Sequence, residues 1–351
     1  MSEEFEQKLA SVRRKFDRAH DDAGFDDISR ELGTLSATVN KLTADVAEVR
    51  SRGYAFRSYL EHKAEVLNKN WDDIRRQAQR SIDDERDRLR SSLREIESRL
   101  DKSETGGSVA MKMKFGGAAV NLDDIDGEVD ELARLVSSAE SRIRHAFSTM
   151  ANDINSTKRQ IDQINWFMDE KDEASFEFLA GESLFLLAEA EWVATGKGKQ
   201  DPDGILYLTD QRLIFEQKEK TGKTLGFFGG KMEQEVEWEV PLHLVEDVKS
   251  ENKGMFGGKD MLYFTLGSGA PHREITVEVK GSADNKFWMK QINRMKTGDT
   301  KDERAIEPDP EVIESLKNAP TECHVCGATL PKIMAGQAQI DCQYCGAVIR
   351  I

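Results

Sequence analysis

Apolar residues recur in steps of three and four along much of the first half of this sequence, a seven-residue repeat that is typical of coiled coils. The first run comprises Ile28, Leu32, Leu35, Val39, Leu42, Val46, Val49, Gly53, Phe56 and Leu60, and the repeat resumes at Leu89, Leu93, Ile96 and Leu100. No proline precedes Pro202. We therefore expect one long helix over residues 28–100.

A second apolar repeat runs from Ile125 to Met168 and predicts another long helix. Between the two, residues 106–122 alternate apolar and polar side chains around Gly116-Gly117, which favours a small β-hairpin. Residues 1–170 are thus predicted to form a coiled-coil hairpin with its tip at about 106–122.

The two predicted helices differ in length, so the second cannot cover the first at about 1.5 Å per residue. The apolar seam from Leu32 to Val49 would then face water. We expect self-association to bury it, giving a homo-oligomer. The alternative is that residues 1–27 fold back over the seam, with a turn near Gly24.

Composition limits the possible partners and location. The formal charge of −15 disfavours nucleic acid as a partner, because the net field repels a phosphate backbone. The N-terminal residues lack the features of a signal peptide, and no run of apolar residues is long enough to span a membrane. We expect a cytoplasmic protein whose membrane contact, if any, is peripheral on the inner face.

Residues 181–298 contain several short alternating segments, followed by an amphipathic helix that includes Trp288. Within them, the run Gly204-Ile-Leu-Tyr-Leu-Thr-Asp-Gln-Arg-Leu-Ile-Phe215 resembles the central hairpin of the GRAM and bacterial PH-like families. The resemblance implies an antiparallel β-barrel or sandwich closed by a C-terminal helix. It also implies a domain that binds lipid head groups or protein segments without performing chemistry.

The side chains of this hairpin have structural interpretations. Leu206, Leu208, Leu213 and Phe215 can face the core, while Thr209 and Asp210 are typical of a tight polar turn. We interpret Arg212 as a solvated or salt-bridged turn residue.

Three segments combine large apolar residues with glycine and lysine, which is typical of loops that contact a membrane or a partner protein. The candidate contact residues are Phe227, Phe228, Lys231, Met255, Phe256, Lys259, Met111, Met113 and Phe115. The alternative is that these segments fold back onto their own domains.

All four cysteines lie near the C-terminus as two CxxC pairs: Cys323 with Cys326, and Cys342 with Cys345. The spacing predicts a zinc ribbon with one structural Zn²⁺ per chain, because four thiolates complete a tetrahedral shell. We do not expect His324 to be a ligand. The ribbon occupies residues 321–351 and follows a proline-containing linker at 299–320.

The sequence as a whole predicts a multidomain α+β protein: a long α-helical coiled-coil hairpin, a PH-like domain and a small zinc ribbon. Gly222-Lys223-Thr224 resembles the end of a phosphate-binding loop, but the upstream glycine is replaced by Gln217. We expect no enzyme, but a scaffold or adaptor that docks on membrane lipid or a protein target. Two alternatives are an adaptor without lipid contact and a nucleic-acid-associated zinc-ribbon factor.

Overall fold

A computed structural model describes most of the chain. The described residues are 3–109, 122–179, 181–196, 201–221, 231–254, 258–281, 284–311, 314, 318–330 and 339–350; the side chains of 106–109, 220–221 and 231–232 are not described. The chain divides into two compact units. One comprises Met1–Asp45 with Glu61–Gln160, and the other comprises Val46–Leu60 with Ile161–Ile351.

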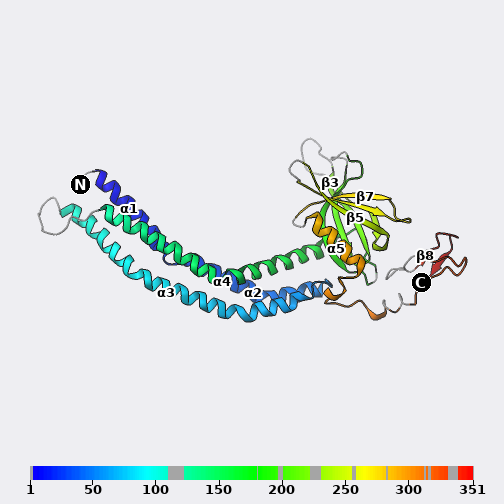
Figure 1. Cartoon of the computed structure of the whole chain (residues 1–351), viewed down its shortest axis with the longest axis horizontal. Helices are drawn as coiled ribbons and strands as arrows, with labels where there is room; N and C mark the ends of the chain where they lie inside the picture. The colour runs from blue at the N-terminus through cyan, green and yellow to red at the C-terminus, as the bar shows by residue number, and fades with distance from the viewer. Residues whose placement is uncertain are drawn as a thin grey trace. The chain divides into compact units, whose positions relative to one another are not determined.

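The first unit is a bundle of long helices (Figure 1). Its helices are α1 (Glu3–Asp22), α2 (Asp26–Ser51), α3 (Tyr59–Val109) and α4 (Leu122–Glu173), of which α2, α3 and α4 continue into the second unit. Ion pairs join Lys15 of α1 to Asp126 of α4 at 2.7 Å, and Lys158 of α4 to Asp45 of α2 at 3.9 Å. The helices α1 and α2 therefore follow one another alongside α4, and α3 runs in the opposite direction.

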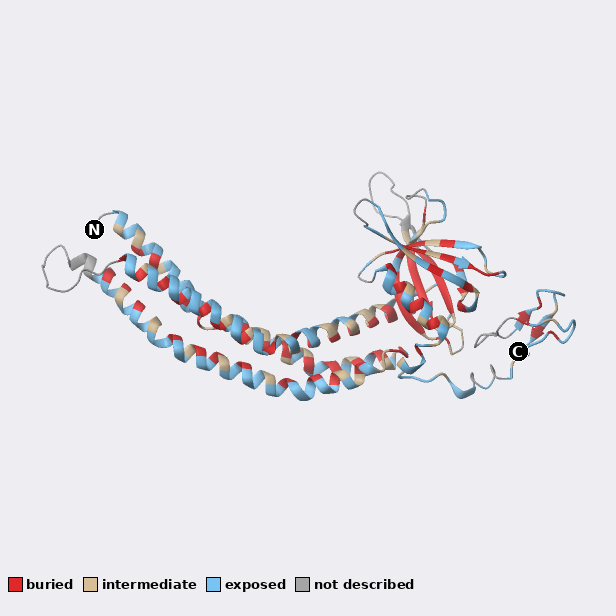
Figure 2. Ribbon diagram, viewed as in Figure 1, coloured by how far each residue is buried: buried red, intermediate tan, exposed pale blue. Residues whose placement is uncertain are grey.

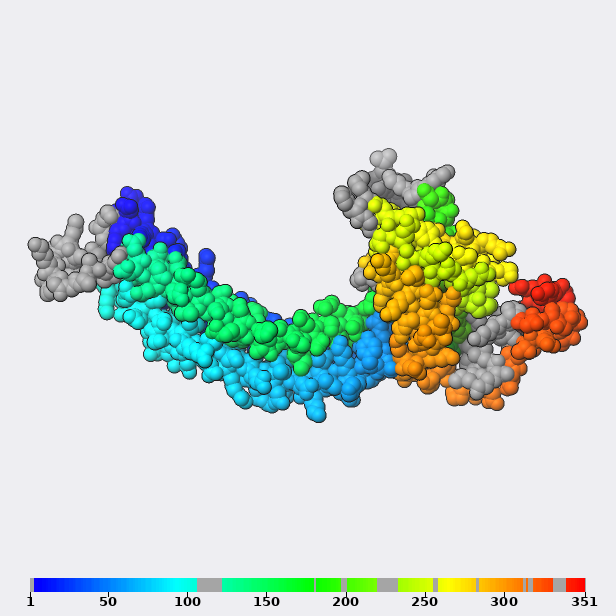
Figure 3. All heavy atoms as spheres, in the orientation of Figure 1, coloured from blue at the N-terminus to red at the C-terminus, as the bar shows by residue number. Residues whose placement is uncertain are grey.

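The apolar seam of the first repeat is buried inside this bundle, so the expectation that it faces water is wrong. Leu32, Leu35, Val39, Leu42, Val46 and Val49 are all buried. Hydrogen bonds from Trp71 to Ser36 (2.8 Å) and from Asn68 to the Val39 carbonyl (3.5 Å) show that α3 packs beside α2. Figure 2 shows buried residues along the inward faces of the helices, and Figure 3 shows α3 and α4 in contact.

The expected single helix over residues 28–100 is interrupted at Arg52–Ser58, between α2 and α3. No proline is needed, because other groups hold this turn. Gly53 and Arg57 have φ values of 90° and 59°, and the Arg50 guanidinium donates hydrogen bonds to the carbonyls of Tyr54 (2.7 Å) and Phe56 (2.6 Å). A left-handed glycine ends a helix readily, and the buried aromatic side chains then favour the turn over a continued helix.

Residues 3–22 form a helix and a turn follows near Gly24, but this segment does not cover the seam as the alternative expected. The helix α1 buries Leu9, Val12 and Phe16. It pairs with the late part of α3, since Arg13 lies 2.9 Å from Asp101. It therefore extends the bundle beyond the seam instead of covering it.

The predicted β-hairpin tip at about 106–122 is helical at its two described ends. Residues 106–109 continue α3 and Leu122 begins α4. Residues 110–121, including Met111, Met113 and Phe115, lie outside the described residues.

The second unit contains a seven-stranded antiparallel sheet in the order β4-β3-β2-β1-β7-β6-β5. The strands are β1 (Leu184–Trp192), β2 (Asp203–Thr209), β3 (Arg212–Thr221), β4 (Lys231–Pro241), β5 (Val245–Lys253), β6 (Lys259–Leu266) and β7 (Glu274–Val279). Two meanders, β1–β4 and β5–β7, are joined where β1 pairs with β7. With the helix α5 (Asn285–Thr297) that follows, this is a PH-like fold.

The core of this domain confirms the predicted inward residues. Leu206, Leu208, Leu213 and Phe215 are all buried. The helix α5 packs on β5 and β6 through Trp288, Ile292 and Met295, while Phe287 is exposed. Asp284 caps α5 by accepting a hydrogen bond from the Phe287 amide at 2.7 Å, and Gly298, with φ of 81°, ends it.

The turn between α2 and α3 belongs to the PH-like unit. The Tyr54 hydroxyl donates to the Phe185 carbonyl of β1 at 3.1 Å, and the Phe56 ring meets the Phe185 ring edge-on at 4.9 Å between centroids. The Ala305 amide donates to the Ala55 carbonyl at 2.7 Å. The domain thus uses residues well outside 181–298.

The C-terminal segment is a small two-stranded unit. The strands β8 (Gln339–Asp341) and β9 (Val348–Arg350) pair antiparallel. Leu330, Ile340 and Ile349 form a small core together with Cys323 and Cys342.

Candidate metal centre and binding surface

The two CxxC segments adopt matching turns. The Gly327 amide donates to the Cys323 carbonyl at 2.7 Å, and the Gly346 amide donates to the Cys342 carbonyl at 2.8 Å. Both glycines have positive φ values, 72° and 70°. This left-handed backbone is costly for other residues, so the glycine after each CxxC pair has a conformational reason.

The turns bring four sulfur atoms together. The Sγ atoms of Cys323 and Cys345 lie 3.7 Å apart, those of Cys326 and Cys342 lie 3.6 Å apart, and all four lie within 4.8 Å of one another. A tetrahedral zinc ion with Zn–S bonds of about 2.3 Å needs sulfur atoms about 3.8 Å apart. The observed spacing therefore fits a four-cysteine metal site, and His324 is outside the cluster.

The electrostatics of this cluster also suit a cation. The Tyr344 amide is the main cause that lowers the pKa of the Cys342 thiol to about 7. At Cys326 the Ala328 amide lowers the pKa, but Cys345 and the other neighbouring thiols outweigh it and raise the pKa to about 12. Thiolates this close repel one another, and a divalent cation would stabilise all four in the deprotonated form.

The polar residues of the β2–β3 turn form a buried network. Thr209 Oγ1 accepts hydrogen bonds from the amides of Gln211 (3.1 Å) and Arg212 (2.9 Å), which confirms the predicted polar turn. The Arg212 side chain is 7% exposed, and its Nε lies 2.9 Å from Oε1 of Glu182, whose side chain is fully buried. The interpretation of Arg212 as a salt-bridged turn residue is confirmed, and the residue is structural.

Asp210 joins this turn to the segment after α5. It accepts hydrogen bonds from the Ser183 amide at 2.9 Å and from Arg304 at 2.8 Å, and the Arg304 guanidinium also lies over the Phe56 ring at 4.8 Å. Burial raises the pKa of Asp210, and the two hydrogen bonds partly oppose that shift. No sequence signal identified Arg304, because its partners are distant along the chain.

Most of the predicted contact residues lie outside the described residues. These are Phe227, Phe228, Met255, Phe256, Met111, Met113 and Phe115, together with the side chain of Lys231. Lys259 is described and forms an ion pair with Glu278. Within the described residues, no helix is long and apolar enough to cross a membrane.

Strand directions separate the two Phe-Gly-Gly segments. The strands β3 and β6 both run in the same direction as β1. Residues 222–230 follow the end of β3, whereas residues 255–257 come before the start of β6. The strand ends that flank these two segments therefore lie at opposite ends of the strands of the sheet.

Three described lysines of the barrel are paired with carboxylates. Lys218 lies 2.7 Å from both Glu170 and Glu173, and Lys280 lies 3.3 Å from Glu191. With Lys259 also paired, these side chains do not form a free basic cluster for an anionic head group.

The edge strand β4 carries a row of acids. Glu233, Glu235, Glu237 and Glu239 lie at every second position of the sequence, although a register shift in the β3–β4 pairing leaves Glu237 without a partner on β3. The strand β4 ends the sheet because it pairs only with β3. Glu239 pairs with Arg212, whereas the other three form no ion pair with any residue that the structure describes. Partial burial and the neighbouring charge of Glu235 raise the pKa of Glu237.

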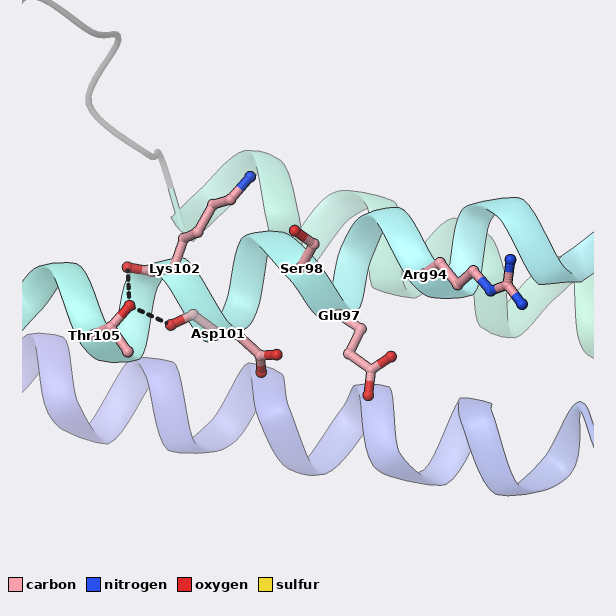
Figure 4. A pocket seen from close by; sticks show the side chains of 6 residues that line it. All are labelled: Arg94, Glu97, Ser98, Asp101, Lys102 and Thr105. Atoms are coloured by element: carbon pink, nitrogen blue, oxygen red, sulfur yellow. Dashed lines mark hydrogen bonds between the residues drawn. The ribbon is translucent and has the colours of Figure 1, made fainter.

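A polar hollow lies on α3 in the helical unit (Figure 4). It is lined by Arg94, Glu97, Ser98, Asp101, Lys102 and Thr105. Glu97 and Asp101 point toward α1, and Asp101 pairs with Arg13 there, while Thr105 donates to the Asp101 carbonyl at 2.8 Å. Asp101 and Thr105 thus have structural partners at this hollow.

No family model and no curated protein matches the chain. Among solved structures, the Vps36 N-terminal PH domain is similar at 15% identity with a TM-score of 0.25, covering 34% of this chain and 83% of that chain. A DUF1696 family protein with a pleckstrin-homology domain from Shewanella loihica PV-4 is similar at 18% identity with a TM-score of 0.24, covering 38% of this chain and 92% of that chain. The DH/PH domains of PDZ-RhoGEF, solved in complex with activated RhoA, are similar at 10% identity with a TM-score of 0.26, covering 85% of this chain and 96% of that chain. The strand order and the C-terminal helix α5 by themselves define the PH-like fold.

Proposed function

We propose that this chain is a non-enzymatic adaptor whose PH-like domain binds a basic, extended segment of a partner protein along β4. The observation that supports it most is the acidic row Glu233, Glu235 and Glu237, which forms no ion pair with a described residue and lies on a strand that ends the sheet. An edge strand offers main-chain hydrogen bonds to an added strand, and side chains at alternate positions select its charge.

Two further features support a basic protein segment over an anionic membrane. Partial burial and, after it, repulsion from Glu235 raise the pKa of Glu237, and a cationic side chain placed beside the two carboxylates would relieve that repulsion. Lys218, Lys259 and Lys280 of the barrel are already paired with carboxylates. The buried ionisable groups of the β2–β3 turn also serve one another, which supports a binding role rather than catalysis.

A binding titration with the full-length chain tests this proposal. The probe is a fluorescent peptide of alternating lysine and valine, and we expect saturable binding that weakens with salt. Reversing two charges, Glu235→Lys with Glu237→Lys, should weaken it by at least about tenfold, or about 1.4 kcal/mol. The matched control is Asp72→Lys with Asp73→Lys, which reverses two acids on α3. Equal loss in both double variants would show non-specific attraction and contradict the proposal.

Membrane docking is the second candidate, and the sequence of two loops at one end of the strands supports it. Residues 193–202 and 222–230 both connect strands at the same end of the sheet's strands. These two loops contain Lys197, Lys199 and Lys223 besides Phe227 and Phe228. Flotation with phosphatidylserine vesicles should then be reduced by Phe228→Ser but not by Phe256→Ser, because the strand ends that flank residue 256 lie at the opposite end of the strands. Absence of binding to anionic vesicles would eliminate this candidate.

We also propose that Cys323, Cys326, Cys342 and Cys345 hold one Zn²⁺ per chain. The sulfur spacing supports this, and four thiolates leave no position for water, so the ion would be structural. Elemental analysis of protein purified without chelator should find about one zinc per chain. Cys326→Ser should lose the metal and the ribbon fold, whereas His324→Ala should keep both; metal-free wild-type protein would contradict the site.

A further inference from the structure

Burial of the predicted seam removes the reason for which self-association was expected, but another surface of the helical unit remains apolar. Leu135 of α4 is 45% exposed, although its neighbours Leu132 and Val136 are buried. It lies at the rim of a shallow hollow of about 240 Å³ between α3 and α4, whose floor is Ile96 and Leu132. This hollow is described within one compact unit and does not depend on the PH-like domain.

Charged residues flank this leucine in a symmetric order. Glu128 and Arg142 stand seven residues before and after Leu135 on α4, so all three share one side of the helix at spacings of about 10.5 Å. On the adjacent side of α3, Glu95 and Arg88 are likewise seven residues apart, with Ser92 between them in the hollow. One end of the surface is therefore rich in acids and the other carries arginines.

Such a surface is complementary to itself. We infer that a second copy of this chain docks here, with its α4 antiparallel and Leu135 packed on the partner's Leu135. This arrangement places Glu128 opposite the partner's Arg142, and Glu95 opposite the partner's Arg88, on both sides of a two-fold axis. An isologous interface requires this relation: when one residue contacts a second residue of the partner, the second residue of the first copy contacts the first residue of the partner.

The charged groups remain accessible for that contact. Glu128 and Arg142 already pair within the chain with Arg99 and Glu85, yet their side chains are 45% and 54% exposed. Arg88 is 69% exposed. The second copy would therefore extend existing pairs into a network, with Leu135 as its apolar centre.

Sedimentation velocity of the full-length chain across micromolar concentrations tests the inference. We expect a reversible dimer that dissociates with added salt. Leu135→Lys should raise the dissociation constant at least tenfold, because it places two like charges at the two-fold axis. The matched control is Val66→Lys, since Val66 is 39% exposed on α3 outside this hollow. Circular dichroism verifies that both variants stay folded.

A second variant tests the charge order independently. Glu95 forms no ion pair with a described residue, so Glu95→Lys should weaken the dimer without disturbing the bundle. The inference is overturned by a wild-type chain that stays monomeric throughout the range. It is also overturned if Leu135→Lys dimerises as wild type does, or if Glu95→Lys leaves the dissociation constant unchanged.

Discussion

At the scale of single residues, burial decides whether an ion pair stabilises this fold. Arg212 and Arg134 both pair with a glutamate, but Arg212 is 7% exposed beside the buried Glu182, whereas Arg134 is 74% exposed. We predict that Arg212→Leu lowers the free energy of unfolding by about 3–5 kcal/mol, because Glu182 would keep an unpaired buried charge. Arg134→Leu should change it by about 0–1 kcal/mol. Urea denaturation compares the two variants, and equal effects would contradict this account.

At the scale of elements, the turn between α2 and α3 is part of the PH-like core. Phe56 is buried against Phe185 and beneath Arg304, while Phe287 of α5 is exposed. We predict that Phe56→Ala costs about 3–5 kcal/mol of stability through the cavity it leaves. Phe287→Ala, the matched control, should have little effect. Thermal unfolding monitored by tryptophan fluorescence reports on both, since Trp192, Trp238 and Trp288 all lie in the PH-like domain.

At the scale of the whole molecule, the compact unit that holds the PH-like sheet extends beyond residues 181–298. The PH-like unit also uses Val46–Leu60, the end of α4 and Arg304, through contacts such as Tyr54 with the Phe185 carbonyl. We predict that a fragment of residues 181–298 melts at a lower temperature than the same domain in the full chain, or aggregates. A fragment with an unchanged melting temperature in calorimetry would contradict this view of the boundary.

The sequence alone determined features whose cause is local. Period-seven apolar residues dictate helices, the turn chemistry of Thr209 and Asp210 closes the β2–β3 hairpin, and two CxxC-Gly segments need only their own backbone to present four thiols. Contacts between distant segments were decided only by the tertiary structure. The break at Arg52–Ser58 was invisible because it depends on Tyr54 and Phe56 finding Phe185. The partners of the Leu32–Val49 seam were equally hidden, because an apolar stripe encodes that it will be buried but not which helix will cover it.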